Sequence, residues 1–350
     1  MIRRLHISSS ANDRVKRLRR VLRHGRRDGV FVAHGYRAIR RALDAGAPVR
    51  ELYAAPELFL GDADAALVDA AGVPVTWLSP DVFRSLPGLP RPDGLLAVVE
   101  RYPTPLDDLP RNGLVVVAEA VERPGNLGTI VRTACGAGAA ALVAADPRTD
   151  LFHPETVHAS VGTIFELPVA ASSTSEAIAW WEGRVVVATP NGRRAHWDAD
   201  FRGATAIVVG NERVGVSDAW LARADETVRI PLPGPADSLN VAVAAGIVLF
   251  EALRSRERDG RLDLDREPGR QLRDADRRAC AESALLAPQV DHQVAEPVDH
   301  RRLVGEAGRR PDEAEHLHPA RDAVERSELV VQDAAHEERG VPRRDVRLVG

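Results

Sequence analysis

Polar residues that could bind or activate a substrate occur in three short stretches, each next to an apolar run. The stretches are ERPGNLGTIVRTA (122–134), VVGNERVG (208–215) and IPLPGPADSLN (230–240). Open parallel sheets bind ligands at the carboxyl ends of their strands. The three stretches therefore predict one ligand site, built from Asn, Arg, Glu and Ser side chains that could position a polar substrate or stabilise charge.

The familiar phosphate-binding loops are missing from the sequence. A dinucleotide site needs G-x-G-x-x-G directly after a strand. The run CGAGAA (135–140) follows a predicted helix and lacks the third glycine, and GNERVG (210–215) lacks the middle one. No G-x-x-x-x-G-K-[ST] run occurs, and the two cysteines, Cys135 and Cys280, allow neither a disulfide framework nor a Cys-based zinc site. We therefore expect no metal, and a small molecule held in another way.

Alternating strand and helix signals around these stretches predict an α/β fold with a mostly parallel sheet. Continuous apolar runs predict buried strands, and an apolar pattern with a terminal glycine predicts a helix over 126–139. The strands are expected at 114–120, 140–145, 184–190, 205–210 and 227–232, with an edge strand near 166–170. Asp237 or Ser238 is expected to cap the helix that follows the third stretch.

The rest of the chain divides by composition. Residues 1–100 contain a small α/β pattern that begins near residue 12, residues 101–113 carry three prolines and read as a linker, and 114–256 form the second α/β domain. Residues 257–350 contain no Phe, Trp or Tyr and show no packing period, so we expect a disordered tail.

Basic residues concentrate at the N-terminal end. Residues 1–50 carry 14 Lys and Arg against 3 Asp and Glu, whereas residues 257–350 carry 17 against 22. The segment 14–27 has eight basic residues, no acid and an apolar stripe at helical spacing. This asymmetry favours an anionic partner such as nucleic acid. The residues expected to bind RNA are Arg14, Lys16, Arg17, Arg20 and Arg23.

Together the three stretches resemble the motifs of the SpoU/TrmH family of RNA ribose 2′-O-methyltransferases, within the SPOUT superfamily. Residues 12–100 are similar to the family's ribosomal-protein-L30e-like RNA-binding domain, which points to the ribosomal-RNA branch with its AviRb-like enzymes. The resemblance implies a C-terminal trefoil knot, a homodimer, S-adenosylmethionine as methyl donor and a structured RNA substrate, with 23S ribosomal RNA favoured over transfer RNA. A cytoplasmic enzyme without membrane or metal is expected.

Carried over residue by residue, the resemblance also implies the members of the site. The residues expected around the target ribose are Asn126, Arg132, Glu212, Ser238 and Asn240. The residues expected to line the cofactor pocket are Thr189, Gly210, Ile230 and Leu239. Arg132 is expected to contact phosphate and the 2′-oxygen and to stabilise negative charge, since an arginine is a poor base.

Simpler interpretations exist for the same residues. Arg132 could be an ordinary surface charge, Asn126 only a helix cap, and Glu212 an ordinary loop acid. Two other functions also remain open. The chain could be a non-catalytic RNA-binding protein of the same fold, which the retained Arg132 disfavours, or a nicotinamide-dependent oxidoreductase, which the missing dinucleotide motif disfavours.

Three positions depart from the family pattern. His34 stands where relatives commonly carry Glu, and His158 and Val161 stand where they commonly carry Arg and Met. A phosphate contact at His158 would become weak or pH-dependent. We expect these departures to affect RNA preference and not cofactor binding.

Overall fold

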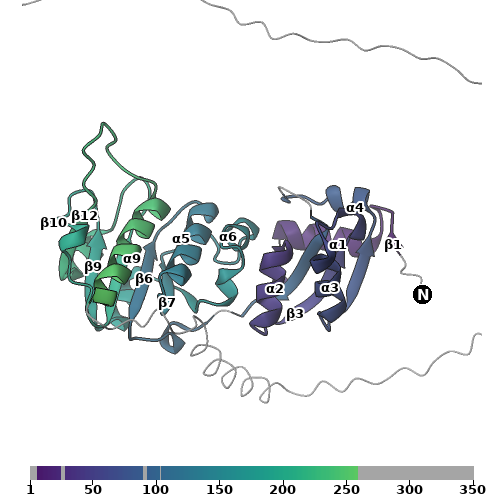
Figure 1. Ribbon diagram of the computed structural model, residues 1–350, viewed down its shortest axis with the longest axis horizontal. Helices are drawn as coiled ribbons and strands as arrows, with labels where there is room; N and C mark the ends of the chain where they lie inside the picture. The colour runs from purple at the N-terminus through teal and green to yellow at the C-terminus, as the bar shows by residue number, and fades with distance from the viewer. Residues whose placement is uncertain (1–5, 25–27, 90–92, 103, 259–350) are drawn as a thin grey trace, which may run out of the picture. The chain divides into compact units, whose positions relative to one another are not determined.

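The computed structural model describes residues 6–24, 28–89, 93–102 and 104–258, all of them within one compact unit (Figure 1). These residues build two sheets, one before and one after residue 104. The predicted α/β fold is confirmed. The tail predicted to be disordered lies outside the described residues from position 259 onward. The helix before it ends at Arg258, two residues beyond the predicted boundary.

The first sheet has five strands in the order β1-β4-β3-β5-β2. Its strands are β1 (His6–Ile7), β2 (Val30–His34), β3 (Val49–Ala54), β4 (Val75–Leu78) and β5 (Leu95–Glu100). Strands β1, β4 and β3 are parallel, whereas β5 is antiparallel to both β3 and β2. Its helices are α1 (Asp13–His24), α2 (Tyr36–Asp44), α3 (Asp62–Ala70) and α4 (Pro80–Arg84).

Alternation of side chains along β2 explains how the first sheet is buried on both faces. Val30 and Val32 pack in one apolar cluster with Leu18 of α1 and Phe83 of α4. Phe31 and its alternate neighbours on β2 pack in a second cluster with residues of α2 and α3. Successive side chains of a strand point to opposite faces, so each face receives its own layer of helices.

The second sheet has seven parallel strands in the order β10-β12-β9-β11-β6-β7-β8. The strands are β6 (Leu114–Glu119), β7 (Ala141–Ala145), β8 (Val169–Ser172), β9 (Arg184–Ala188), β10 (Arg194–Ala195), β11 (Thr205–Val209) and β12 (Glu226–Arg229). The strands expected from apolar runs are therefore confirmed, with β8 at an edge as expected. The two-residue β10 was missed because it is too short to show a pattern.

Helices cover both faces of the second sheet, as a parallel sheet requires. Helices α5 (Pro124–Gly136), α6 (Pro154–Ala159) and α9 (Val241–Arg258) contribute to the apolar cluster on one face. Helices α7 (Thr174–Trp180) and α8 (Asp218–Arg223) lie with the cluster that holds Trp180, Trp181 and Trp220. The positions of α5 and α9 matter most, because both begin at the carboxyl ends of strands.

Aromatic and ionic contacts join residues of the first region, 1–100, to residues that follow β7 in the second region. The Phe31 ring lies 4.5 Å from the ring of Phe152, centroid to centroid. The Arg41 guanidinium donates to the Val161 carbonyl oxygen at 2.8 Å and forms an ion pair with Glu166 at 3.3 Å. Val161 has a positive φ of 52°, an uncommon conformation for a β-branched residue. In this conformation the Val161 carbonyl oxygen accepts the hydrogen bond from Arg41 of α2.

The two departures His34 and His158 meet in this region. Their imidazole rings stack with centroids 4.3 Å apart and planes 11° apart. His34, the last residue of β2, is buried, and His158 of α6 is exposed. Burial, reinforced by repulsion from His158, lowers the pKa of His34 from 6.5 to about 4. The pair is therefore a stack around a neutral His34 at physiological pH.

This low pKa predicts acid-sensitive folding. Between about pH 6.5 and 4, His34 takes up a proton in the unfolded chain but stays neutral in the fold, so the unfolded state binds more protons. The free energy of unfolding should then fall as the pH drops through this window, by about 3 kcal/mol in total. Urea denaturation at a series of pH values measures this slope.

The variant His34→Phe keeps a ring against His158 but has no group that titrates. It should lose most of this acid dependence. The control His6→Phe, at the exposed end of β1, retains His34 and should keep the wild-type slope. An unchanged slope in His34→Phe would show that other groups cause the acid sensitivity.

Candidate functional site

The carboxyl ends of β12, β9, β11 and β6 lie side by side, because these four strands are adjacent and parallel. Chain order reverses between β11 and β6: β7 and β8 continue on one side of β6, and β9, β11 and β12 lie on the other. A reversal of this kind opens a crevice at the strand ends, where ligands of open sheets bind. The three stretches singled out in the sequence all lie at this edge.

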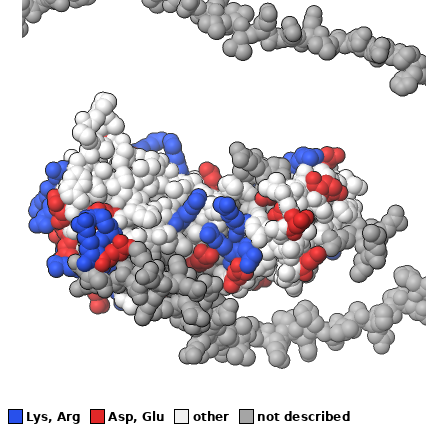
Figure 2. All heavy atoms as spheres, viewed as in Figure 1, with Lys and Arg blue, Asp and Glu red and all other residues white. Residues whose placement is uncertain are grey.

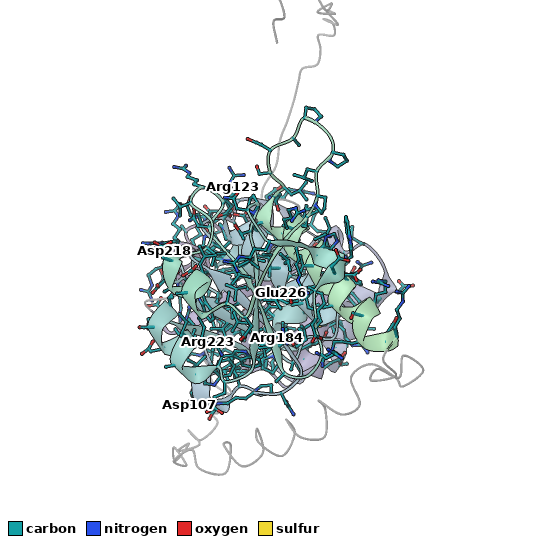
Figure 3. All side chains as sticks on the ribbon, turned by 90° about the vertical axis from the view of Figure 1, so that its left-hand side faces the viewer. Asp107, Arg123, Arg184, Asp218, Arg223 and Glu226 are labelled. Atoms are coloured by element: carbon teal, nitrogen blue, oxygen red, sulfur yellow. The ribbon has the colours of Figure 1, made fainter. Side chains whose placement is uncertain are left out.

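Figure 3 shows this arrangement from the side of β10 and β12. Arg184 and Glu226, the first residues of β9 and β12, lie lower than Arg123, which follows β6. The loop between β12 and α9 projects from the same end as Arg123, and Asp107 marks the opposite end. The projecting loop therefore stands over the carboxyl ends of the strands.

Helix α5 brings Asn126 to this edge. Pro124 occupies its first turn, where a missing backbone N–H costs nothing, and Asn126 follows two residues later. Gly128 allows α6 to come close, since a Cβ there would lie 2.3 Å from the Thr156 carbonyl oxygen. The glycine of this motif is therefore a packing residue that lets α5 and α6 come close together.

The turn after β11 is held by Asn211, a residue that sequence reasoning missed. Its Oδ1 accepts hydrogen bonds from the backbone N–H groups of Arg213 (2.8 Å) and Val214 (3.1 Å). Its Nδ2 donates to the carbonyl oxygen of Ala120 at 2.9 Å and to Glu122 at 3.1 Å. Asparagine commonly closes turns in this way, so its position after Gly210 in GNERVG was the available signal.

Glu119, at the end of β6, is a second residue that was missed. Its carboxylate is buried and accepts hydrogen bonds from the Thr174 hydroxyl at 2.9 Å and from the backbone and hydroxyl of Ser217 at 2.8 and 2.6 Å. It thus ties the starts of α7 and α8 to the end of β6. An acid at the end of an otherwise apolar run was its only signal.

Three of the predicted site residues form a hydrogen-bonded chain. Asn240 Nδ2 donates to Asn126 Oδ1 at 3.0 Å, and Asn126 Nδ2 donates to Glu212 Oε1 at 2.7 Å. The other Glu212 oxygen accepts from the Glu122 backbone N–H at 3.1 Å. The structure therefore joins one residue from each of the three sequence stretches.

The charge of Glu212 is stabilised by this chain. Partial burial acts to raise the pKa of its carboxyl, but the hydrogen bonds from Asn126 and from backbone N–H groups outweigh burial and the pKa is lowered. Glu212 is thus an anion and an acceptor that orients the Asn126 amide. The Asn126 amide is fixed with its oxygen toward Asn240 for the same reason.

Asn240 also caps α9, which corrects the expected cap. Its Oδ1 accepts from the backbone N–H groups of Ala242 (2.9 Å) and Val243 (3.4 Å), and the helix begins at Val241. The expectation that Asp237 or Ser238 caps this helix is wrong. Both residues lie before the helix in the exposed loop, where the Ser238 hydroxyl donates to Asp237 at 3.4 Å.

The four residues expected to hold a cofactor follow three neighbouring strands or the projecting loop. Thr189 follows β9, and its backbone N–H donates to the Val228 carbonyl oxygen at 2.9 Å. Gly210 follows β11, and Ile230 follows β12 and packs on the core. Leu239, in the loop, is 36% exposed. The edge thus offers backbone groups together with apolar side chains.

Gly210 is a position where only glycine fits the present backbone. A Cβ there would lie 2.4–2.5 Å from the backbone of Gly215 and Val216. The close approach closes the turn from 210 to 215, which carries Asn211 and Glu212. Any larger residue would have to displace this turn.

Arg132 is brought to the exposed surface of α5 and is not part of the hydrogen-bonded chain. Among the described residues no hydrogen bond or ion pair of its side chain is found. Its neighbour Thr133 packs against Gly246 of α9, where a Cβ on the glycine would lie 3.4 Å from Thr133 Cγ2. Its guanidinium is therefore uncommitted among the described residues, and the next residue along the helix lies at the contact between α5 and α9.

The basic residues expected to bind RNA lie on α1, but several already have partners. Arg14 donates to the Thr76 hydroxyl at 2.9 Å, Lys16 pairs with Asp13 at 3.1 Å, and Arg20 pairs with Asp28 at 3.2 Å. Arg17 and Arg23 are exposed. The helix therefore offers less free positive charge than its sequence suggests.

Further arginines surround the strand ends of the second sheet. Arg123, Arg148, Arg193 and Arg213 follow β6, β7, β9 and β11 respectively, and all four are exposed.

In the part of the chain that the structure describes, no cluster of three metal-ligating side chains occurs. No described helix is long and apolar enough to span a membrane.

Comparison with known proteins agrees with this arrangement. Residues 113–250 match the SpoU rRNA Methylase family, and residues 12–97 match the MRM3-like substrate binding domain. A 23S rRNA (uridine(2479)-2′-O)-methyltransferase of Streptomyces viridochromogenes is 35% identical over 242 residues, which cover 66% of this chain and 84% of that protein. The 23S rRNA (guanosine(2553)-2′-O)-methyltransferase RlmP of Bacillus subtilis is 30% identical and is covered over 97% of its length, with 70% of this chain aligned.

A solved structure shows the same fold. The SpoU methyltransferase AviRb from Streptomyces viridochromogenes, in complex with the cofactor AdoMet, superposes with a TM-score of 0.64 at 32% identity. The match covers 70% of this chain and 98% of that chain.

The role of Asn240 as a cap can be tested by stability measurements. The variant Asn240→Ala removes the acceptor of the first helical N–H groups and should lower the free energy of unfolding by about 1 kcal/mol. Asn240→Ser keeps a good cap but loses the hydrogen bond to Asn126, so its free energy of unfolding should lie between those of Asn240→Ala and the wild type. Chemical denaturation followed by circular dichroism measures both.

The matched control is Ser238→Ala in the same loop. It should leave the free energy of unfolding unchanged, because Ser238 does not contact the helix start. A loss in Ser238→Ala equal to that in Asn240→Ala would contradict the assignment.

Proposed function

The chain belongs to the SpoU rRNA methylase family, and from this we propose that it transfers a methyl group to a ribose 2′-hydroxyl of ribosomal RNA. The observation that carries the proposal is the hydrogen-bonded chain from Asn240 through Asn126 to Glu212. It joins the three family motifs at the strand ends where an open sheet binds its ligand. The substrate is 23S rRNA, the RNA named for both relatives described above.

The methyl donor is S-adenosylmethionine, and the residues at the edge of the sheet fit it. This molecule has no phosphate, so it needs none of the glycine-rich phosphate loops that the sequence lacks. Ile230 and Leu239 offer apolar walls for an adenine ring, and the close-packed turn after Gly210 brings backbone groups to the strand ends. Thr189, which follows β9, is the fourth residue that we assign to the cofactor site.

When bound, the donor would supply a methyl group activated on a positively charged sulfur: the 2′-oxygen would form the new bond to carbon as the carbon–sulfur bond breaks, the neutral thioether would leave, and the 2′-hydroxyl proton would pass to water. The protein's residues then have to position the ribose and manage the negative charge that grows on its 2′-oxygen. Asn126 and Asn240 present fixed amides at the site, with Glu212 holding the Asn126 amide in place. Arg132, whose guanidinium is free, stabilises the developing charge and contacts a phosphate.

Ser238 lies in the loop two residues before Asn240 and has no partner beyond Asp237 among the described residues. We propose that its hydroxyl binds the ribose or a phosphate.

The three prolines at 231, 233 and 235 limit the conformations of the loop, which lowers the entropy lost on binding.

RNA binding is supported by the exposed arginines around the strand ends and by the basic helix α1. Arg123, Arg148, Arg193 and Arg213 carry positive charge on the same edge as the site. Phosphate contacts of this kind contribute affinity without reading sequence. We assign the first region, 1–100, to RNA binding, 101–113 to the linker and 114–256 to methyl transfer.

A homodimer is part of the proposal and is supported by the outer face of α9. Val243 and Phe250 are 52% and 50% exposed, and Ile247 lies between them at helical spacing. Figure 2 shows a largely uncharged surface from the projecting loop over the N-terminal part of this helix. An exposed apolar stripe of this kind favours burial against a partner. The trefoil knot and a cytoplasmic location likewise belong to the proposal.

The role of Arg132 can be tested by single-turnover methylation of ribosomal RNA from a strain that lacks this gene. Arg132→Ala should slow methyl transfer about 10²- to 10³-fold and leave binding of S-adenosylmethionine unchanged. Arg132→Lys keeps the charge but loses the planar fork, and should stay near the Ala level if the fork holds both ribose and phosphate.

Calorimetric titration with S-adenosylmethionine checks that each variant retains its cofactor site. The control Arg84→Ala, on α4, removes an exposed arginine outside the site and should react at the wild-type rate with saturating RNA. A normal rate in Arg132→Ala would remove this residue from the mechanism.

The proposed dimer can be tested by light scattering after gel filtration. The wild type should show twice the 37.9-kDa mass of the chain. Phe250→Glu places a charge in the apolar stripe and should shift the protein toward the monomer. Leu60→Glu changes a side chain that is 84% exposed in the first region and should not. A wild-type mass equal to one chain would contradict the homodimer.

A further inference from the structure

A cleft with a volume of about 210 Å³ lies between α1 and the first sheet. It is separate from the strand-end site, since its lining comes from α1, from strands β2, β3 and β5, and from Asp28 just before β2. The described residues show no other role for it. Its volume is enough for one nucleobase.

Apolar side chains lie beneath the cleft, whereas its accessible surface is mainly that of charged side chains. Val30 of β2, Val98 of β5 and the ring of Tyr53 of β3 are all buried and line it from the sheet. Leu18 and Val21 line it from α1. These buried side chains form the base of the cleft and leave its charged side chains as the groups that a ligand would contact.

Two ion pairs stand at the rim of the cleft. Arg20 pairs with Asp28 at 3.2 Å, and Arg50 pairs with Glu100 at 2.7 Å. Both arginines are therefore held in place with their charge partly balanced. The remaining charged side chains of the lining, Arg17 and Glu51, are not paired with each other or with another ionic partner among the described residues.

Glu51 is an acceptor with capacity to spare. Its Oε1 accepts a hydrogen bond from the Tyr53 hydroxyl at 2.7 Å, and no donor to Oε2 is found among the described residues. Burial and the nearby Glu51 charge raise the pKa of Tyr53, so the phenol keeps its proton and continues to donate. A carboxylate has about four lone-pair sites, of which this contact uses one.

We infer that this cleft binds one unpaired guanine nucleotide of the RNA, with the N–H edge of the base on Glu51 and a phosphate on Arg17. Guanine presents N1–H and the N2 amino group side by side, which matches the two oxygens of a carboxylate. Uracil presents carbonyl oxygens on either side of its single N–H, and these would face the negative charge of Glu51. The inference rests on the proposed function in that the ligand is RNA.

This nucleotide is distinct from the methylated one, because the reacting groups lie at the carboxyl ends of β6, β9, β11 and β12. The cleft would instead recognise a neighbouring unpaired base and so contribute to the choice of RNA. The Watson–Crick edge of a flexible, unpaired base is the part of RNA that proteins read most readily.

The test uses the full-length protein and fluorescently labelled heptanucleotides, with binding followed by anisotropy without S-adenosylmethionine. The sequences are uridine heptamers with G, A, C or U at the central position. The wild type should bind the G oligonucleotide at least about tenfold more tightly than the U oligonucleotide, as expected for one bidentate contact to a base. No preference for G, or an equal preference for A or C, would overturn the inference.

The informative variant is Glu51→Gln. A glutamine oxygen can still accept from the Tyr53 hydroxyl, so the fold is retained, but the second oxygen is replaced by a donor. The preference for G should fall to less than about twofold. The control Glu57→Gln removes an exposed carboxylate from outside the lining and should keep the preference. A preference that persists in Glu51→Gln would overturn the role of Glu51.

Arg17→Ala separates the phosphate contact from base recognition. It should weaken binding of all four oligonucleotides by a similar factor and leave the ratio between G and U unchanged. Loss of the ratio in this variant would contradict the assignment of Arg17 to phosphate.

The binding assay is independent of methyl transfer. If ribosomal RNA is not methylated but the G preference depends on Glu51, the proposed function fails and the cleft stands. If RNA is methylated at the wild-type rate and no preference is found, the cleft fails and the proposed function stands.

Discussion

Three loops that are far apart in the sequence are held together by two side-chain hydrogen bonds. Asn126 follows β6, Glu212 follows β11 and Asn240 precedes α9, and the Asn126 amide uses both of its ends to join the other two. If one member is lost, a neighbour in the chain loses one hydrogen bond and the orientation of the Asn126 amide is no longer fixed from both ends. The geometry of the proposed ribose site depends on this chain, because the amides have no other common support among the described residues.

Close backbone packing makes this chain possible. Gly128 lets α6 approach α5, and Gly210 lets the turn after β11 fold back on itself. Asn211 then secures this turn to the segment after β6, so Glu212 reaches Asn126 from a fixed position. The motifs therefore combine residues that we propose contact a ligand with residues that only position the backbone. A sequence pattern does not separate these two kinds, whereas the contacts do.

The sequence predicts the second sheet well because its strands are buried on both faces and form continuous apolar runs. The same runs show where the strands end, so the polar stretches that follow them predict a site at the strand ends. The cap of α9 was assigned wrongly because Asp237, Ser238 and Asn240 are all good N-caps within four residues. Which one caps the helix depends on where the helix starts, and the chain resumes apolar packing only at Val241 and Ala242. Partners such as Asn126 and Glu212, 86 residues apart, leave no local signal at all.

The stacked histidines show a further limit of reading positions one at a time. His34 and His158 each depart from the family pattern, and each departure taken alone suggested a change in RNA contact. In the structure the two rings touch, so they form one coupled replacement. The stack needs His34 to be neutral, and burial keeps it neutral at physiological pH. Burying a neutral ring costs less than burying a charge, which must remain paired to be tolerated. The contact between β2 and α6 therefore depends on pH, because protonation of His34 would place a charge in a buried position beside His158.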